Sequence, residues 1–199
     1  LCKGNPKSTG TKLISVCGHV QRPGNYEITM GTPMKELIYE MCGGMRPGRT
    51  LKAVIPGGSS VPLMDAKDVE TCLMDYEGVV AAGSMLGSGG MIVMDDTTDM
   101  VYQIWRLTKF YAHESCAQCT QCREGTGWTE RVLERILGGK GKDADFQLLL
   151  DLAHNMTGTT ICVLSDSCAT PVVSGIQKFR GEFEAYMNGS RAGMMAGVS

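Results

Sequence analysis

Three cysteines at intervals of three residues, Cys116, Cys119 and Cys122, constrain this chain more than any other feature of its sequence. This C-x2-C-x2-C run can bring three thiols onto one small object without long-range folding, and it is typical of the ligand run of cubane iron-sulfur clusters. Zinc sites usually pair C-x2-C with a second ligand pair further along the chain, and a redox-active dithiol needs only two thiols. The run therefore predicts a 4Fe-4S cluster, with zinc binding and thiol redox chemistry as alternatives.

A fourth ligand has to come from elsewhere, because Arg123 and Glu124 follow the run directly. The candidates are Cys162 and Cys168, which both lie in the irregular stretch TTICVLSDSCATP. We prefer Cys162 because a short extended piece precedes it, whereas Cys168 is close to the start of the next predicted helix. Arg123 is interpreted either as a donor of hydrogen bonds to cluster sulfurs or as a solvated side chain. His113 is assigned to the surroundings of the cluster or to the surface.

The remaining cysteines do not form a site by their spacing. Nine cysteines in 199 residues is an odd number, scattered among ordinary core residues, and is not typical of a paired extracellular disulfide framework. A reducing compartment fits better. Four of them are interpreted as packing residues or free thiols: Cys2, Cys17, Cys42 and Cys72.

Composition and charge exclude some classes of partner. With 43% hydrophobic and 20% charged residues, the chain can bury a core. A net charge of -2 argues against binding to nucleic-acid phosphates. No apolar stretch approaches the roughly 20 residues that a membrane-spanning helix needs. We therefore expect no nucleic-acid partner and no direct insertion into a membrane.

The first half of the chain alternates short strands with one helix. Strands are predicted at 13–18, at 25–28 and at 51–55, with a helix between the last two that Thr32 caps and Gly43-Gly44 ends. Another strand follows at 91–94. This order predicts a small β-grasp (ubiquitin-like) domain.

The second half has helical periodicity from Thr98 onward. Apolar residues recur at three- and four-residue steps in four segments. The last of these is predicted to begin with Thr170 as its cap and Pro171 in its first turn. The fold class is therefore α+β, a β-grasp domain followed by an all-α four-helix domain that carries the cluster.

The segment HESCAQCTQCREGTGW, residues 113–128, resembles a family of flavoprotein subunits of respiratory complex I, the F type of bacterial NADH-quinone oxidoreductases. The family's form is HESC-G-QCTPCREG, so Ala117 and Gln121 replace a glycine and a proline, and neither supplies a ligand. Four further segments resemble other blocks of the family: GTKLISVCGHVQRPGNYEI, AVIPGGSSVPL, LGSGGMIVMD and GTTICVLSDSCATPV.

The resemblance implies particular roles for residues of the second half. It makes Cys162 the fourth cluster ligand and puts Cys168 where the family usually has a small residue. Val163 and Leu164 are implied to contact FMN. The implied cofactors are a 4Fe-4S cluster and FMN, the latter bound mainly by an N-terminal flavin domain that these 199 residues lack.

The resemblance also implies a domain order. Residues 1–10 would be a linker from the flavin domain, 11–95 the β-grasp domain and a connecting strand, 96–187 the helical cluster domain, and 188–199 a flexible tail. The chain would be the C-terminal half of an NADH dehydrogenase (quinone) subunit, and would not oxidise NADH alone.

The implied partners are other subunits of the complex I peripheral arm, a thioredoxin-like 2Fe-2S subunit and a large multi-cluster subunit. NADH would bind through the missing domain. The location would be cytoplasmic, peripheral on the inner face of a bacterial membrane, or alternatively the matrix side of the inner mitochondrial membrane. Two alternative functions stay open: the flavin subunit of an NAD-linked hydrogenase or formate dehydrogenase, and a non-enzymatic zinc or iron-sulfur adaptor.

Overall fold

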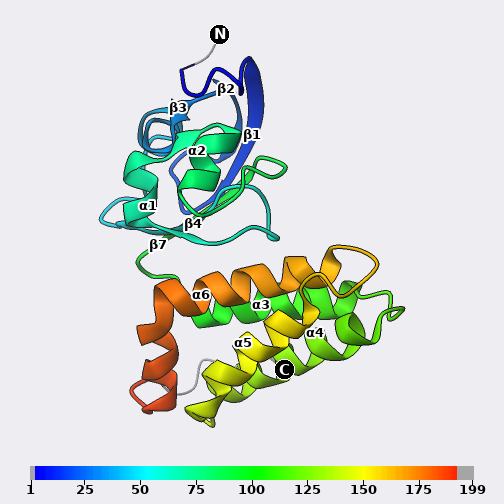
Figure 1. Cartoon of the computed structure of the whole chain (residues 1–199). Coiled ribbons are helices and arrows are strands. Elements are labelled where there is room, and N and C mark those ends of the chain that lie inside the picture. Colours follow the sequence, from blue (N-terminus) through cyan, green and yellow to red (C-terminus); the bar gives the residue numbers. More distant parts are fainter. Residues whose placement is uncertain (1–2, 192–199) are drawn as a thin grey trace. The chain divides into compact units, whose positions relative to one another are not determined.

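The computed structural model describes residues 3–191 and divides into two compact units, Leu1–Thr98 and Asp99–Ser199 (Figure 1). The expected linker and the expected flexible tail fall partly outside the described residues, at 1–2 and 192–199. The described part of each segment makes hydrogen bonds to other residues of its own unit. The Lys3 N–H donates to the carbonyl of Met30 at 2.9 Å, and Arg191 donates to Asp99 at 3.0 Å. The domain limits drawn from the sequence stay predictions.

A five-stranded mixed sheet organises the first unit. The strand order is β2 (Gly24–Thr29), β1 (Thr11–Gly18), β7 (Gly90–Asp95), β4 (Leu51–Ile55) and β5 (Met64–Asp65). The first and last strands along the chain, β1 and β7, are parallel neighbours, and all other neighbours are antiparallel. A parallel pair needs a crossover connection, which the chain between β1 and β7 provides. This is the β-grasp arrangement, so the predicted fold class is confirmed for this unit.

The sheet follows from alternation of apolar and polar side chains. In β1, Ile14 and Val16 are buried, whereas Leu13, which directly precedes Ile14, is 67% exposed. Three short helices complete the unit, η1 (Glu36–Met41), α1 (Ala66–Thr71) and α2 (Tyr76–Ala81). Buried side chains of the sheet and of these helices form one hydrophobic cluster.

The prediction that Thr32 and Pro33 begin a helix is wrong. They form the two-residue strand β3 (Thr32–Pro33), which pairs antiparallel with β6 (Leu73–Met74). The Thr32 hydroxyl donates to the carbonyl of Thr29 at 2.8 Å and does not cap a helix. Pairing with a strand about forty residues away decided this local conformation. Helical structure begins at Met34, and the π-helix η1 begins at Glu36.

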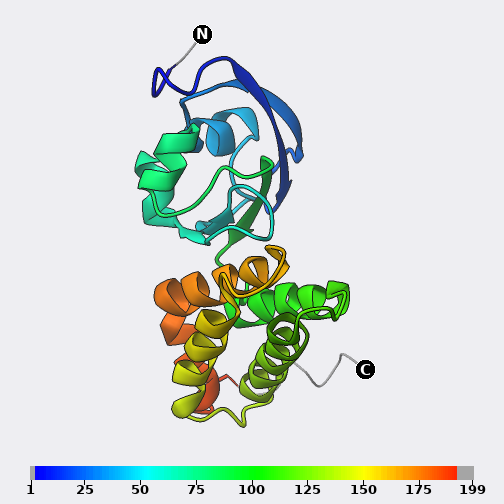
Figure 2. The same ribbon diagram turned by 45° about the vertical axis from the view of Figure 1, so that its right-hand side comes forward.

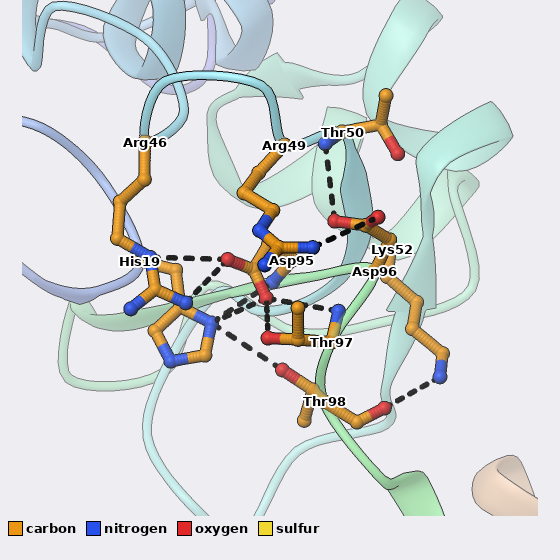
Figure 3. A network of polar contacts seen from close by, with 9 residues as sticks. All are labelled: His19, Arg46, Arg49, Thr50, Lys52, Asp95, Asp96, Thr97 and Thr98. Atoms are coloured by element: carbon orange, nitrogen blue, oxygen red, sulfur yellow. Dashed lines mark hydrogen bonds and ion pairs between the residues drawn. The ribbon is translucent and has the colours of Figure 1, made fainter.

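A buried carboxylate holds the end of β7 in place (Figure 3). Asp95 accepts hydrogen bonds from Arg46 at 2.5 Å and from the N–H of Thr97 at 3.1 Å, and Nδ1 of His19 lies 2.9 Å from it. Burial alone would raise the pKa of Asp95, but the hydrogen bonds from Thr97 and Arg46 outweigh it and hold the pKa well below its usual range. The network joins three segments of the first unit at the point where its last strand ends.

Four helices form the second unit (Figures 1 and 2): α3 (Met100–Glu114), α4 (Thr120–Leu137), α5 (Ala144–Met156) and α6 (Leu164–Met187). The predicted all-α four-helix fold is confirmed here. Both α3 and α5 pack against α4 and α6. Each helix buries a stripe of apolar residues at helical spacing, such as Val101, Ile104 and Trp105 in α3. No helix within residues 3–191 is long and apolar enough to cross a membrane.

The last helix begins seven residues earlier than predicted, at Leu164 instead of Pro171. Pro171 therefore lies inside α6, where it removes one backbone hydrogen bond of the helix. The residues before it explain why the helix still forms, since buried Ser165, Cys168 and Ala169 continue the helical spacing of the buried face. The helix bends further along, at Phe179, whose φ and ψ of -123° and 26° are not helical (Figure 1).

Candidate metal centre

A five-residue loop between α3 and α4 carries the start of the cysteine run. Helix α3 ends at Glu114, and helix α4 begins at Thr120. Cys116 lies in the loop, and Cys119 is the N-cap residue of α4. Cys122 lies in the first turn of α4, three residues further, so Cys119 and Cys122 face the same side of the helix start. The three-residue spacing thus places the thiols of Cys119 and Cys122 on the same side of α4.

A second loop, between α5 and α6, carries Cys162. This residue directly precedes Val163, the N-cap of α6. Side chains hold the loop at both ends. The Thr160 hydroxyl donates to the carbonyl of Cys162 at 2.8 Å, and the Ser165 hydroxyl donates to the carbonyl of Met156 at 3.1 Å. The position of Cys162 is therefore defined by hydrogen bonds as well as by the start of α6.

All four predicted ligands line one cavity of about 240 Å³. Its wall consists of Ser115, Cys116, Gln118, Cys119, Cys122, Thr160, Ile161 and Cys162. The cavity is more than ten times larger than the roughly 15 Å³ that one water molecule needs. Within residues 3–191, no three His, Cys, Asp or Glu side chains are close enough together to hold a single metal ion. The four thiols thus surround a common space, and this donor set and space fit a polynuclear iron-sulfur group bound by four thiolates.

Two helix N-termini adjoin the thiols. Neither the Cys119 side chain at the start of α4 nor the Val163 side chain at the start of α6 caps its helix by a hydrogen bond. The first backbone N–H groups of a helix have no partner within it, and they carry partial positive charge. Thiolates are stabilised at such positions. Two of the four predicted ligands, Cys119 and Cys162, therefore lie at the starts of helices.

Known families match both halves of the chain. Residues 12–102 match the SLBB domain, and residues 102–186 match the NADH-ubiquinone oxidoreductase-F iron-sulfur binding region. The chain is 51% identical over 183 residues to the F subunit of the NADH-quinone oxidoreductase of Rickettsia bellii, and 49% identical over 182 residues to an F subunit of Rhizobium meliloti. Over the region it spans, this chain is a homologue of NADH-quinone oxidoreductase F subunits. The resemblance seen in the sequence is confirmed.

The homology covers most of this chain and a smaller part of its relatives. The match to the R. bellii protein covers 92% of the chain and 44% of that protein. A solved structure of an NAD+-reducing [NiFe]-hydrogenase in the H2-reduced state is similar with a TM-score of 0.80 and 30% identity, over 92% of this chain and 30% of that one. The chain thus spans less than half the length of the F subunits that it matches.

The two candidates for the fourth ligand lie in different surroundings in this F-subunit homologue. Cys162 is exposed and lines the cavity. Cys168 is fully buried on α6 and is not among the residues of the cavity wall. Burial raises the pKa of the Cys168 thiol to about 12, which disfavours the thiolate form that binds metals.

The other residues singled out in the sequence are placed as follows. His113 is exposed in the last turn of α3 and is not part of the cavity wall. Val163 is 74% exposed, and Leu164 is the first residue of α6. Cys17, Cys42 and Cys72 belong to the first unit, and Cys2 lies outside the described residues.

Four residues of the cavity wall were not predicted from the sequence as site residues: Ser115, Gln118, Thr160 and Ile161. Ser115 places its hydroxyl 3.3 Å from the sulfur of Cys122, and Thr160 orders the backbone at Cys162. For Ser115, the sequence did contain an indication of a role at the site, because its hydroxyl directly precedes the ligand Cys116. Serine and threonine are too common in loops for that signal to stand out.

Proposed function

We propose that this chain is the cluster-bearing part of an NADH-quinone oxidoreductase flavoprotein subunit, with one 4Fe-4S cluster bound by Cys116, Cys119, Cys122 and Cys162. The observation that carries the proposal is the single cavity lined by all four thiols. The match of residues 102–186 to an iron-sulfur binding region supports it. A bound cluster of this kind would supply electron transfer in steps of one electron.

The residues of the chain would have distinct tasks in this site. The four cysteines would bind iron as thiolates. The first N–H groups of α4 and α6 would offset part of the negative charge that four thiolates bring together. The Ser115 hydroxyl would donate to the Cys122 sulfur, which lies 3.3 Å from it.

For the whole subunit, we propose NADH dehydrogenase activity with quinone as the final acceptor, and FMN and NADH bound mainly outside these 199 residues. Val163 and Leu164 would face the FMN, and the exposure of Val163 supports that role. The proposed partners are the thioredoxin-like 2Fe-2S subunit and the large multi-cluster subunit. The proposed location is the inner face of a bacterial membrane, with the mitochondrial matrix side as the alternative.

A second candidate keeps the cluster and changes the complex. The similarity to an NAD+-reducing [NiFe]-hydrogenase favours the flavin subunit of such an enzyme. The higher identity of about 50% to NADH-quinone oxidoreductase F subunits favours the quinone-linked complex. Identification of the subunits that co-purify with the full-length protein distinguishes the two complexes.

Anaerobic reconstitution with iron and sulfide tests the ligand set. We expect about four iron atoms per chain, and a low-temperature EPR signal of a reduced cubane after treatment with dithionite. Cys162→Ala should lose this signal, because no other described thiol lines the cavity beside the run. Cys168→Ala is the matched control and should keep both the iron and the signal.

Two results would contradict the proposal. A chain that takes up only zinc would favour the non-enzymatic adaptor. A Cys162→Ala variant that behaves like the parent, together with a Cys168→Ala variant that loses the cluster, would move the fourth ligand to Cys168.

A further inference from the structure

Arg123 bridges the loop that carries the first two cysteines. Its Nη1 donates to the carbonyl of Ala117 at 2.9 Å, across six residues and from the first turns of α4 back to the middle of the loop. Its Nε donates to Glu124 at 2.9 Å, which holds the guanidinium in place from the helix side. The side chain is 44% exposed, but these two contacts give it a defined direction.

The residue that Arg123 holds is in an unfavourable conformation. Ala117 has a φ of 64°, the one positive φ of a non-glycine residue within 3–191. A Cβ atom disfavours this left-handed region, so the loop would relax to other conformations without a restraint. The N–H of Ala117 is held only weakly, by Ser115 Oγ at 3.4 Å. The bond from Arg123 is therefore the stronger side-chain restraint at the midpoint between Cys116 and Cys119.

We infer that Arg123 is a positioning residue of the cluster site, which keeps the loop of Cys116 and Cys119 in the shape that the ligands need through the Ala117 carbonyl. This inference rests on the proposed function. It differs from both interpretations drawn from the sequence, because the guanidinium is neither simply solvated nor assigned to the cluster sulfurs. Residues that orient ligands in this way affect retention of a metal group by about 10–100-fold.

Arg123→Lys is the decisive variant, because it keeps the charge and loses the planar fork that makes two bonds in fixed directions. Arg131→Lys is the matched control, a further arginine of α4 that lies outside the loop and the cavity wall. Amide hydrogen exchange is measured first on the chain without a cluster. Arg123→Lys should speed exchange in peptides that span residues 115–119 and leave those of α5 unchanged, and Arg131→Lys should leave both unchanged.

The reconstituted chains are then compared by the rate at which a chelator removes the cluster and by the midpoint potential. We expect Arg123→Lys to lose its cluster about ten-fold faster than the parent, with an unchanged potential. Ala117→Gly should restore most of the retention in the Arg123→Lys background, because glycine adopts a positive φ without strain. A purely electrostatic role would give the opposite pattern, with Arg123→Lys like the parent and Arg123→Gln shifted in potential.

The inference is overturned if Arg123→Lys matches the parent in exchange and retention, or if Arg131→Lys loses the cluster equally fast. Failure of the proposed function is distinguishable from this. A parent chain that binds no cluster would refute the ligand set, and the exchange measurement on the chain without a cluster would still decide whether Arg123 restrains the loop.

Discussion

At the scale of single residues, the cysteines of this chain differ in what their surroundings allow. Cys116 and Cys162 are exposed at the cavity, and Cys17 is exposed in the first unit. Cys72 and Cys168 are buried, and burial raises the pKa of each to about 12. A thiol reacts as its thiolate, so exposure and pKa together determine which cysteines are reactive.

Alkylation of the chain without a cluster at pH 8 should therefore label Cys17, Cys116 and Cys162 and leave Cys72 and Cys168 unlabelled. At this pH a thiol with a pKa of about 12 is a thiolate in only about one molecule in ten thousand. After cluster loading, Cys116 and Cys162 should become protected while Cys17 stays reactive as the internal control. Peptide mass mapping measures this. Continued labelling of Cys162 in the loaded chain would contradict its role as a ligand.

A second residue of consequence is Asp95, whose buried carboxylate contacts Arg46, Thr97 and His19 in place of water. Asp95→Asn removes the charge and leaves its partners in place, so we expect a loss of about 2 kcal/mol in the free energy of unfolding of the first unit at pH 6. Asp96→Asn is the control. Its carboxylate is 46% exposed and 3.9 Å from Arg49, so its substitution should cost less than about 0.5 kcal/mol.

The pH dependence of this effect has a defined sign. The pKa of Asp95 is lower in the folded chain than its ordinary value of about 4, so its contribution is complete above pH 4 and is lost as the pH falls toward the folded pKa. The difference between parent and Asp95→Asn should shrink from pH 6 to pH 3. Urea unfolding followed by circular dichroism at both values measures it. An equal difference at both pH values would show that the carboxylate charge does not stabilise the fold.

At the scale of elements, the contact between α4 and α5 depends on a glycine beside the cysteine run. A Cβ added at Gly125 would lie 2.6 Å from two side-chain atoms of Met156, Cγ and Sδ. The two helices can approach at this point only because the side chain is missing. Gly127, two residues further on the same helix, has no such neighbour, and the nearest atom to its Cβ position is Nη1 of Arg131 at 3.7 Å.

These two glycines should respond oppositely to the same substitution. Gly125→Ala should lower the free energy of unfolding of the second unit by about 1–2 kcal/mol, because overpacking outweighs the gain in helix propensity. Gly127→Ala should raise it by about 0.5–1 kcal/mol through propensity alone. Thermal or urea unfolding of the two variants provides the comparison. Equal stabilisation by both would mean that Met156 moves aside without cost.

At the scale of the whole molecule, the chain consists of two units with separate buried clusters. The predicted metal ligands all belong to Asp99–Ser199, and the Asp95 network belongs to Leu1–Thr98. A group that binds only the folded form of one unit stabilises that unit by mass action. Cluster loading should therefore slow amide exchange in α3 to α6 and leave β1 to β7 unchanged, whereas Asp95→Asn should speed exchange in the sheet and leave the helices unchanged. Equal protection of both units on loading would show that they unfold together.

Features that depend on neighbours along the chain could be predicted from the amino-acid order. The cysteine run brings three thiols together over seven residues, and the alternation around Ile14 and Val16 places β1 with one buried face. Periods of two and of 3.6 residues are local properties of the backbone, so they can be read without a structure. The fold class follows from these two periods, and the clustering of three thiols follows from the spacing of the cysteine run.

Features that depend on residues far apart in the sequence became visible only in the folded chain. Pairing with Leu73–Met74 made Thr32 a strand residue. Packing of Ser165 and Cys168 let α6 begin at Leu164, N-terminal to the proline that had been predicted in its first turn. The tertiary structure also brought Cys162 to the cavity from forty residues beyond Cys122 and buried Cys168. The reason is that burial and hydrogen-bond partners are set by packing of whole elements, which overrides the weaker preferences of single residues for caps and turns.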